Sequence, residues 1–176
     1  MADSRHPKQR RGKRVTETAP SSEYKRKFLV VIDDTEECDR ALTFAAYRVR
    51  RTGGTVVLLS VIDPPGFHGL GVEDVLRAEA LEEAEAILDK RIARLKKIGN
   101  IRTETVIREG RGIAAIEQLI EKDRDIAILV LAASASGDGP GPLVTAFATR
   151  SGGTALRIPI TIVPGTMTDE EIIAVC

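Results

Sequence analysis

Apolar segments that alternate with helical patterns constrain the fold of this chain more than any other feature. The strongest segments are Phe28–Ile32, Thr55–Ile62, Ile126–Leu131 and Ile160–Val163, and a less apolar one covers Arg102–Arg108. Apolar residues at consecutive positions are typical of strands that are covered on both faces. Their alternation with helices predicts an α/β fold, a doubly wound parallel sheet of five strands with helices on both faces.

The segments between these strands have the periodicity of helices. Residues 34–51 contain an apolar stripe made of Leu42, Ala45, Ala46 and Val49. Residues 72–98 contain apolar residues at spacings of 3, 4, 4 and 3, namely Leu81, Ala84, Leu88, Ile92 and Leu95. We also predict helices over 112–123 and 143–157, and one helical turn over 169–174.

Two common strand orders, 3-2-1-4-5 and 2-1-3-4-5, are compatible with this alternation. Ligands of doubly wound folds bind beyond the carboxyl ends of the strands, where the strand order reverses. In the first order this crevice lies between the first and fourth strands. Asp33 follows the first of these strands and the loop Ala133–Pro142 follows the other. These two segments are therefore the candidates for a functional site.

Two roles are open for the carboxylate of Asp33. It can accept hydrogen bonds from the ribose hydroxyls or the exocyclic amine of a ligand. Alternatively, it can share with Asp34 the capping of the helix that follows. The position of Asp33 directly after a buried strand suits both roles.

The loop Ala133–Pro142 consists of small residues, glycines and prolines, and it precedes a predicted helix. Such a loop is a setting for a bound phosphate, and it is also a structural turn. Three features weaken the phosphate interpretation. Pro140 and Pro142 have no backbone N–H, Asp138 is anionic, and no Lys or Arg occurs between Ala132 and Phe147.

Several other kinds of site are not supported. His6 and His68 have no further metal ligand at a suitable spacing, so we predict no metal site. Ser134 and Ser136 have no candidate base nearby in the sequence, so we predict no nucleophilic triad and no catalytic residue. We interpret Cys38 as a small packed residue rather than a reactive thiol.

The charges of the chain are balanced. Its 176 residues include 26 Lys and Arg and 26 Asp and Glu, so the formal net charge is zero. This balance argues against non-specific binding to nucleic acid or to a membrane. The chain has two cysteines and no apolar run near the roughly 20 residues that span a bilayer. We therefore expect a soluble cytoplasmic protein.

We expect three segments along the chain: a disordered polar tail over 1–26, one folded domain over 27–165 and a C-terminal tail over 166–176. The N-terminal tail has no periodic apolar pattern, so it cannot offset the entropy lost on ordering. We interpret its basic cluster Lys8–Arg14 as solubilising, and contact with an acidic partner or RNA is the alternative.

Four segments share their order and spacing with a known family. Phe28–Leu42 is similar to an opening that reads V-x-[VI]-D-G-S followed by A-L, and Leu58–Asp63 to a second strand that often reads L-H-V. Gly112–Leu131 is similar to a helix that leads into a buried fourth strand, and Pro159–Pro164 to a closing C-P-V-L-V-V-P. Over about Lys27–Gly165, the chain thus resembles the universal stress protein family.

The resemblance implies the strand order 3-2-1-4-5 of the adenine nucleotide alpha hydrolase-like fold. It also implies that Asp33 and Val61 hold the adenosine of a bound nucleotide. Nucleotide-binding members hold the triphosphate on the motif G-x-x-G-x(9)-G-[ST], and no register of this chain satisfies that motif. The glycines that remain as candidates for contact with the nucleotide are Gly137, Gly139 and Gly141.

Two functions follow from the resemblance. The first is a stress-response or regulatory domain that binds ATP, ADP or AMP, with at most slow hydrolysis of ATP. The second is a family member that binds no nucleotide and acts through dimerisation and association with an unidentified protein. Asp33 favours the first function, and the altered loop favours the second. The resemblance also implies a homodimer that forms through the last strand, Ile160, Thr161, Ile162 and Val163.

The N-terminal tail generates a first prediction. Deletion of residues 1–24 should leave the melting temperature nearly unchanged, because no apolar group in this segment can dock on the domain. Thermal unfolding of the full chain and the truncated chain, followed by circular dichroism, compares the two. A fall of many degrees would contradict the prediction.

Overall fold

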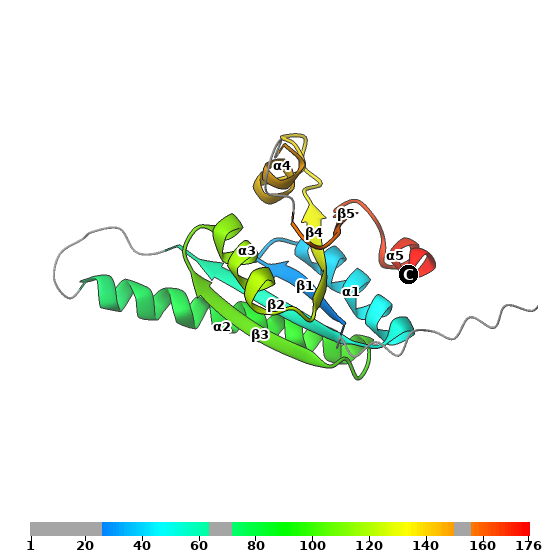
Figure 1. The fold of residues 1–176 in the computed structure, drawn as a ribbon, viewed down its shortest axis with the longest axis horizontal. Helices are drawn as coiled ribbons and strands as arrows, with labels where there is room; N and C mark the ends of the chain where they lie inside the picture. Colours follow the sequence, from blue (N-terminus) through cyan, green and yellow to red (C-terminus); the bar gives the residue numbers. More distant parts are fainter. Residues whose placement is uncertain (1–25, 64–71, 150–155) are drawn as a thin grey trace, which may run out of the picture.

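The computed structural model describes residues 26–63, 72–149 and 156–176. The strands of this part of the chain are β1 (Lys27–Ile32), β2 (Thr55–Ile62), β3 (Thr103–Glu109), β4 (Ile126–Ala133) and β5 (Ile160–Pro164). They form a five-stranded parallel sheet in the order β3-β2-β1-β4-β5 (Figure 1). The fold class expected from the sequence is confirmed, and the structure selects the first of the two strand orders.

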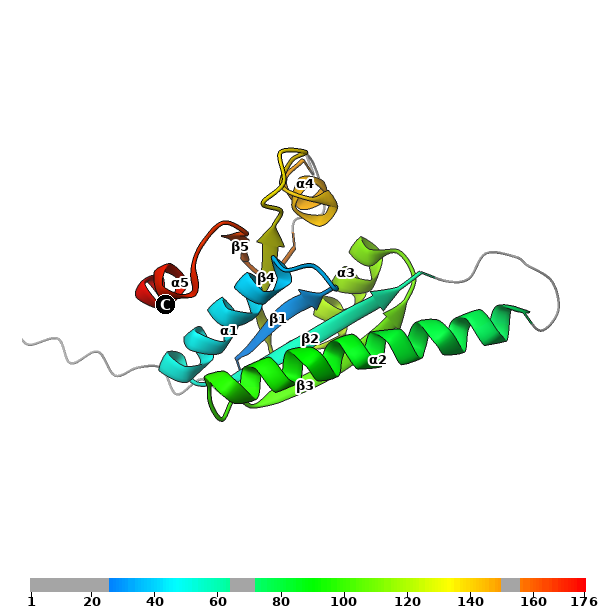
Figure 2. The same cartoon turned by 180° about the vertical axis from the view of Figure 1, so that it is seen from behind.

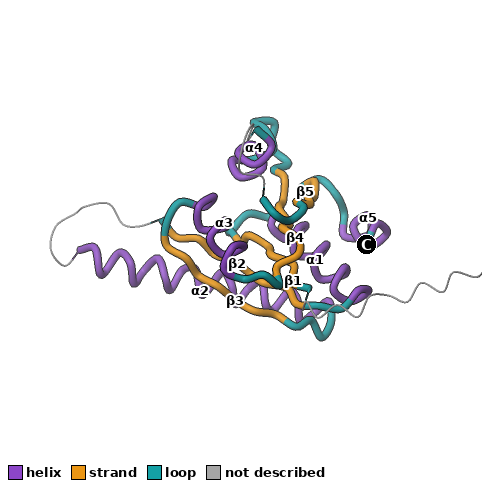
Figure 3. The backbone as a smooth tube through the Cα atoms, in the orientation of Figure 1, coloured by secondary structure: helices purple, strands orange, loops and turns teal. Residues whose placement is uncertain are grey.

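Helices cover both faces of the sheet. They are α1 (Cys38–Thr52), α2 (Val72–Ile98), α3 (Gly112–Lys122), α4 (Pro142–Ala148) and α5 (Asp169–Val175). Helices α1, α2 and α5 lie on one side of the sheet and α3 and α4 on the other, as the two opposite views show (Figures 1 and 2). The alternation of helix and strand along the chain is clear in the tube view (Figure 3).

The central strand β1 contributes side chains to two hydrophobic cores. Phe28, Val30 and Ile32 pack beneath α1 and α2, and Leu29 packs on the opposite face beneath α3. Successive side chains of a strand point to opposite faces, so an uninterrupted apolar run supplies both cores. Full burial of a side chain such as Phe28 or Leu29 contributes about 1.5–3 kcal/mol.

Helix α1 presents the predicted stripe to the sheet. Each of its four predicted residues is buried, namely Leu42, Ala45, Ala46 and Val49. The helix ends before Gly53 and Gly54, whose φ angles of 75° and 122° lie in the region that glycine tolerates. A Cβ at Gly54 would collide with the carbonyl oxygen of Arg26, so only glycine fits there.

Helix α2 packs on the sheet mainly through its C-terminal half. Ala84, Leu88 and Leu95 of the predicted stripe are buried, as is Arg91. The first turns extend beyond the sheet, and Val72 and Val75 are exposed there (Figure 2). Although long, α2 is not apolar enough to cross a membrane, and the same holds for each helix of the described residues.

One predicted helix is shorter than expected. The sequence pattern predicted a helix over 143–157, whereas α4 ends at Ala148 and residues 156–158 are not helical. The pair Gly152-Gly153 in the sequence opposes a helix through 157, because glycine disfavours a helix by about 1 kcal/mol per residue; residues 150–155 lie outside the described residues. The predicted helical turn near the C-terminus is confirmed as α5, which begins with a capping box of Thr168 and Glu171.

The C-terminal segment is packed on the domain. Ile172 of α5 and Cys176 are buried against α1. Arg48 donates a hydrogen bond of 3.1 Å from Nη1 to a backbone oxygen of Cys176. The tail expected over 1–26 lies outside the described residues, apart from Arg26.

Candidate functional site

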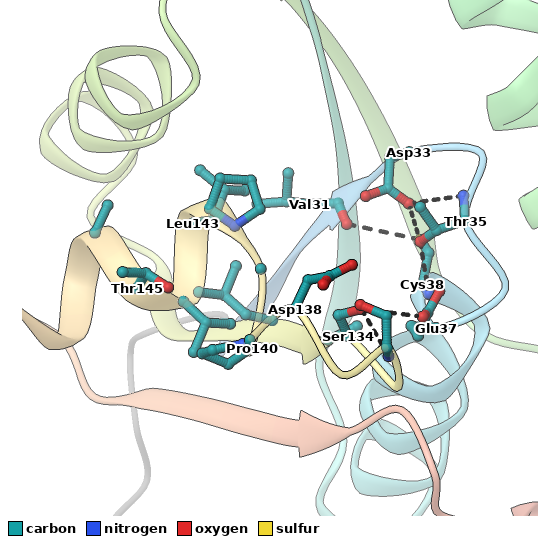
Figure 4. Close-up of a pocket in the computed structure, with 18 residues that line it drawn as sticks. Val31, Asp33, Thr35, Glu37, Cys38, Ser134, Asp138, Pro140, Leu143 and Thr145 are labelled. Carbon is teal, nitrogen blue, oxygen red and sulfur yellow. Dashed lines mark hydrogen bonds between the residues drawn. The ribbon is translucent and has the colours of Figure 1, made fainter.

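A pocket of about 650 Å³ lies at the carboxyl ends of β1 and β4 (Figure 4). Strand β1 pairs with β2 on one side and β4 on the other, so the strand order reverses at this point. The apolar part of the lining includes Val31, Leu131, Leu143 and Val144. The polar part comprises Asp33, Thr35, Glu37, Ser134, Ser136, Asp138 and Thr145. An apolar pocket with a few polar groups at this position of an α/β sheet is typical of a small-molecule site.

Asp33 lies at the rim of the pocket and orders the turn before α1. Its Oδ1 accepts hydrogen bonds from the backbone N–H of Thr35 at 3.0 Å and from the Thr35 hydroxyl at 2.5 Å. The Thr35 hydroxyl oxygen accepts a hydrogen bond of 3.4 Å from the backbone N–H of Cys38, the first residue of α1. Asp33 therefore supports the capping of the helix through Thr35 while its side chain faces the pocket.

A buried arginine fixes the position of this turn. Arg91 of α2 is 3% exposed, and its Nη1 lies 2.7 Å from Oδ1 of Asp39 in α1. Its Nη2 donates to the carbonyl oxygens of Asp33 at 2.8 Å and Thr35 at 2.9 Å. A buried cation requires such partners, because it has lost its hydration. The backbone at Asp33 is thus held by a residue 58 positions further along the chain.

Glu37 connects the two sides of the pocket. Its Oε1 accepts a hydrogen bond of 3.1 Å from the backbone N–H of Ala135 and one of 3.4 Å from the hydroxyl of Ser134. The hydrogen bond from Ala135 is the largest cause that holds the pKa of the Glu37 carboxyl below its usual value of 4.5. The carboxylate is therefore the favoured form in this contact.

The loop between β4 and α4 has further internal hydrogen bonds. The backbone N–H of Ser134 donates to the carbonyl oxygen of Pro140 at 3.1 Å. The backbone N–H of Ser136 donates to the hydroxyl oxygen of Ser134 at 3.1 Å. Gly139 and Gly141 have φ angles of 111° and 96°, so the loop depends on glycine at both positions. Helix α4 then begins with Pro142, which suits the first position of a helix.

The structure brings together three of the five residues assigned to the site from the sequence. Asp33, Gly139 and Gly141 line the pocket. Gly137 and Val61 are not among the lining residues; Val61 lies on β2, where it pairs with Arg108 of β3. Contact of these five residues with a ligand stays a prediction.

Sequence reasoning missed Glu37 and Arg91. Arg91 had a signal, because it lies three residues after Leu88 and four before Leu95, on the buried side of α2. A charged residue at such a position needs a buried partner. Glu37 had no comparable signal, because its partner Ala135 is 98 residues away.

The charged residues that line the pocket are all acidic. They are Asp33, Glu37 and Asp138, and the lining contains no Lys, Arg or His among the described residues. Figure 4 shows the Asp138 side chain directed into the pocket, on the side where Asp33 and Thr35 lie. The site therefore has a negative character.

The remaining candidate groups are packed or already bonded. Burial raises the pKa of the Cys38 thiol to about 11, so the interpretation of Cys38 as a packed residue is confirmed. The Ser134 hydroxyl bonds to Ser136 and Glu37. The described residues contain no group of three His, Cys, Asp or Glu side chains placed to hold a metal ion.

Known proteins share the sequence pattern and the fold. The model of the universal stress protein family matches residues 25–148. Universal stress protein UspA from Lactobacillus plantarum is 17% identical, with a TM-score of 0.65 over 81% of this chain and 99% of that chain. A universal stress protein family member from Burkholderia pseudomallei is 16% identical, with a TM-score of 0.62 over 81% and 98% of the two chains.

A third similar structure is described as a universal stress protein in complex with cAMP. It is 21% identical, with a TM-score of 0.58 over 81% of this chain and 98% of that chain. At these identities the structures establish the fold, which agrees with the adenine nucleotide alpha hydrolase-like type. No curated protein sequence matches the chain.

The contacts of Arg91 generate a second prediction. Arg91→Ala should lower the free energy of unfolding by about 2–4 kcal/mol, because the Asp39 carboxylate and two carbonyl oxygens lose their partner. Lys90→Ala is the matched control. Lys90 pairs with Asp34 on the surface, so its loss should change stability by about 0.5 kcal/mol or less. Urea unfolding measures the free energy of unfolding of both variants. An equal loss in Arg91→Ala and Lys90→Ala would contradict the assigned role of Arg91.

Proposed function

The chain belongs to the universal stress protein family, as its sequence motifs indicated, and we propose that it is a regulatory domain that binds an adenine nucleotide. The proposed site is the pocket between the ends of β1 and β4. The observation that carries the proposal is the position of Asp33 at the rim of this pocket, where the strand order reverses.

The dimensions and lining of the pocket support this proposal. Its volume of about 650 Å³ lies within the range of about 300–1,000 Å³ that is typical of ligand sites. Val31, Leu131 and Leu143 provide apolar surface for a base. The carboxylate of Asp33 provides acceptors for the hydroxyls of a ribose. A nucleoside requires this combination of an apolar wall and a polar rim.

Asp33 has the capacity for such contacts although it already bonds to Thr35. Both hydrogen bonds from Thr35 are accepted by Oδ1. An ionised carboxylate has about four acceptor positions on its two oxygens, so a ligand can bind without breaking the turn. The hydrogen bonds of Arg91 to the backbone keep the carboxylate in place before a ligand arrives.

The similar structure that contains cAMP supports the choice of an adenine nucleotide. We propose that Asp33, Gly139 and Gly141 contact the ligand, because they line the pocket. Val61 and Gly137, which the family resemblance also assigned, lie outside the lining residues and have no role in the proposal.

Titration with nucleotides is the third prediction. Asp33→Ala should weaken binding of AMP by roughly ten- to a hundredfold, because a charge-assisted hydrogen bond contributes about 1.5–3 kcal/mol. ATP, ADP and AMP should bind within about tenfold of one another, since Pro140, Pro142 and Asp138 leave few groups for the outer phosphates. Isothermal titration calorimetry measures the affinities.

Asp34→Ala is the matched control for this titration. Asp34 is the next residue in the chain, is exposed and is not among the lining residues. The proposal predicts that its removal leaves nucleotide affinity unchanged. Absence of heat with every nucleotide would contradict the proposed function, and ATP binding far more tightly than AMP would contradict the assignment of the loop.

Association between copies is a second candidate function, and the edge of the sheet favours it. Strand β5 pairs with β4 and ends the sheet on that side. Ile162 of β5 is a large apolar residue that is 44% exposed. An exposed edge strand presents backbone groups that pair with a second strand. We propose that two copies associate through β5 and form a homodimer.

The dimer is the fourth prediction. Light scattering at micromolar concentration should give the mass of a dimer, and Ile162→Lys should shift it to the mass of a monomer, because a charge opposes burial of the edge. Val175→Lys is the matched control, since Val175 is also exposed but lies on α5. A monomeric wild-type chain, or equal effects of the two variants, would contradict the dimer.

A further inference from the structure

The loop Ala133–Pro142 already holds a carboxylate of the protein itself, that of Glu37. The backbone N–H of Ala135 and the hydroxyl of Ser134 both donate to Oε1 of Glu37. These are the two kinds of donor that hold a phosphate oxygen in a nucleotide site. The Glu37 carboxylate therefore occupies donors that a phosphate of a bound ligand would need.

Neighbouring donors of the loop are also engaged. The N–H of Ser134 bonds to Pro140, and the N–H of Ser136 bonds to the Ser134 hydroxyl. Three consecutive amides, from Ser134 to Ser136, are thus satisfied within the protein. Pro140 and Pro142 have no N–H to offer. A phosphate would have to displace these bonds or use the N–H groups later in the loop, beside the carboxylate of Asp138.

The stem of the Glu37 side chain packs against Gly165. A Cβ at Gly165 would lie 2.5 Å from Cγ of Glu37 and 2.5 Å from the carbonyl oxygen of Ala133. The side chain of Glu37 thus runs directly over Gly165, between the end of β5 and the loop. The bond from Ala135 also lowers the pKa of Glu37, in agreement with a carboxylate that stays charged in this position.

The negative charge of the pocket also disfavours a bound phosphate. Asp33, Glu37 and Asp138 line it, without a Lys, Arg or His among the described lining residues. Carboxylates repel a phosphate that lies within about 8 Å, the Debye length at physiological ionic strength. A ribose and a base carry no charge at neutral pH, so they do not experience this repulsion. A nucleoside meets the apolar wall and Asp33 without this penalty.

From these observations we infer that the pocket selects an uncharged purine nucleoside, adenosine in the simplest case, over its phosphorylated forms, and that Glu37 is the residue that determines this selectivity. The inference rests on the proposed function, because it concerns the same pocket and the same nucleoside contacts. It adds the class of ligand and a specificity residue that the sequence motifs did not identify.

Calorimetric titration of adenosine and AMP into the full chain tests this inference. In the wild-type protein, adenosine should bind at least tenfold more tightly than AMP. In Glu37→Gln, this ratio should fall by about threefold or more, because the amide keeps an acceptor for Ala135 but removes a negative charge. Glu36→Gln is the matched control, since Glu36 is exposed and is not among the lining residues.

The outcomes separate this inference from the proposed function. If adenosine and AMP bind equally, or if Glu37→Gln leaves their ratio unchanged, the role of Glu37 is wrong while nucleotide binding stands. If neither compound binds to the wild-type chain, the proposed function and the inference are both wrong, whereas binding of adenosine without any binding of AMP would contradict nucleotide binding and support the selectivity. A ratio that narrows in Glu37→Gln but not in Glu36→Gln, with both variants folded by circular dichroism, supports the inference.

Discussion

The burial of β1 on both faces of the sheet is the constraint on which the rest of the structure depends. This strand forms hydrogen bonds with β2 on one side and β4 on the other, and its side chains enter two separate cores. Helices must therefore cover both faces of the sheet, and the chain must cross over to reach β4. The crevice at the end of β1 is a consequence of the same arrangement, because the connections leave in opposite directions there. The location of the site thus follows from the packing of apolar strands, whatever the site binds.

The shape of the site depends on a different kind of interaction. Two charged side chains, Arg91 and Glu37, connect segments that the strand order brings together. Arg91 holds the turn after β1 through backbone carbonyls, and Glu37 holds the loop after β4 through a backbone amide. Both contacts involve backbone atoms, so they are insensitive to the identity of the residues whose backbone they bind. These contacts therefore place the turn and the loop independently of the side chains at the bonded positions Asp33, Thr35 and Ala135.

These two kinds of interaction explain how much the sequence could predict. The bounds of β2 and α2 agree with the apolar patterns, because burial of a strand or a helical stripe is a local property of the sequence. The end of α4 was misplaced, because a helical pattern continues in sequence beyond Ala148 while the glycines that follow disfavour the helix. Asp33 was found because it follows a strand directly. Glu37 could not be found, because its role requires the three-dimensional proximity of Ala135.

The departure of the loop from the family motif is best understood together with Glu37. Residues 135–140 are exposed, so their sequence can change with little cost to either core. The loop has no cation and contains two prolines, so it offers few groups to a triphosphate, and its amide at Ala135 takes an acceptor from the protein itself. Glu37 supplies this acceptor from the start of α1. The same carboxylate that accepts hydrogen bonds from the loop also adds a negative charge to the lining of the pocket. In the proposed selectivity, stability of the loop and discrimination against phosphate are two effects of one contact, and neither requires a change in the sheet.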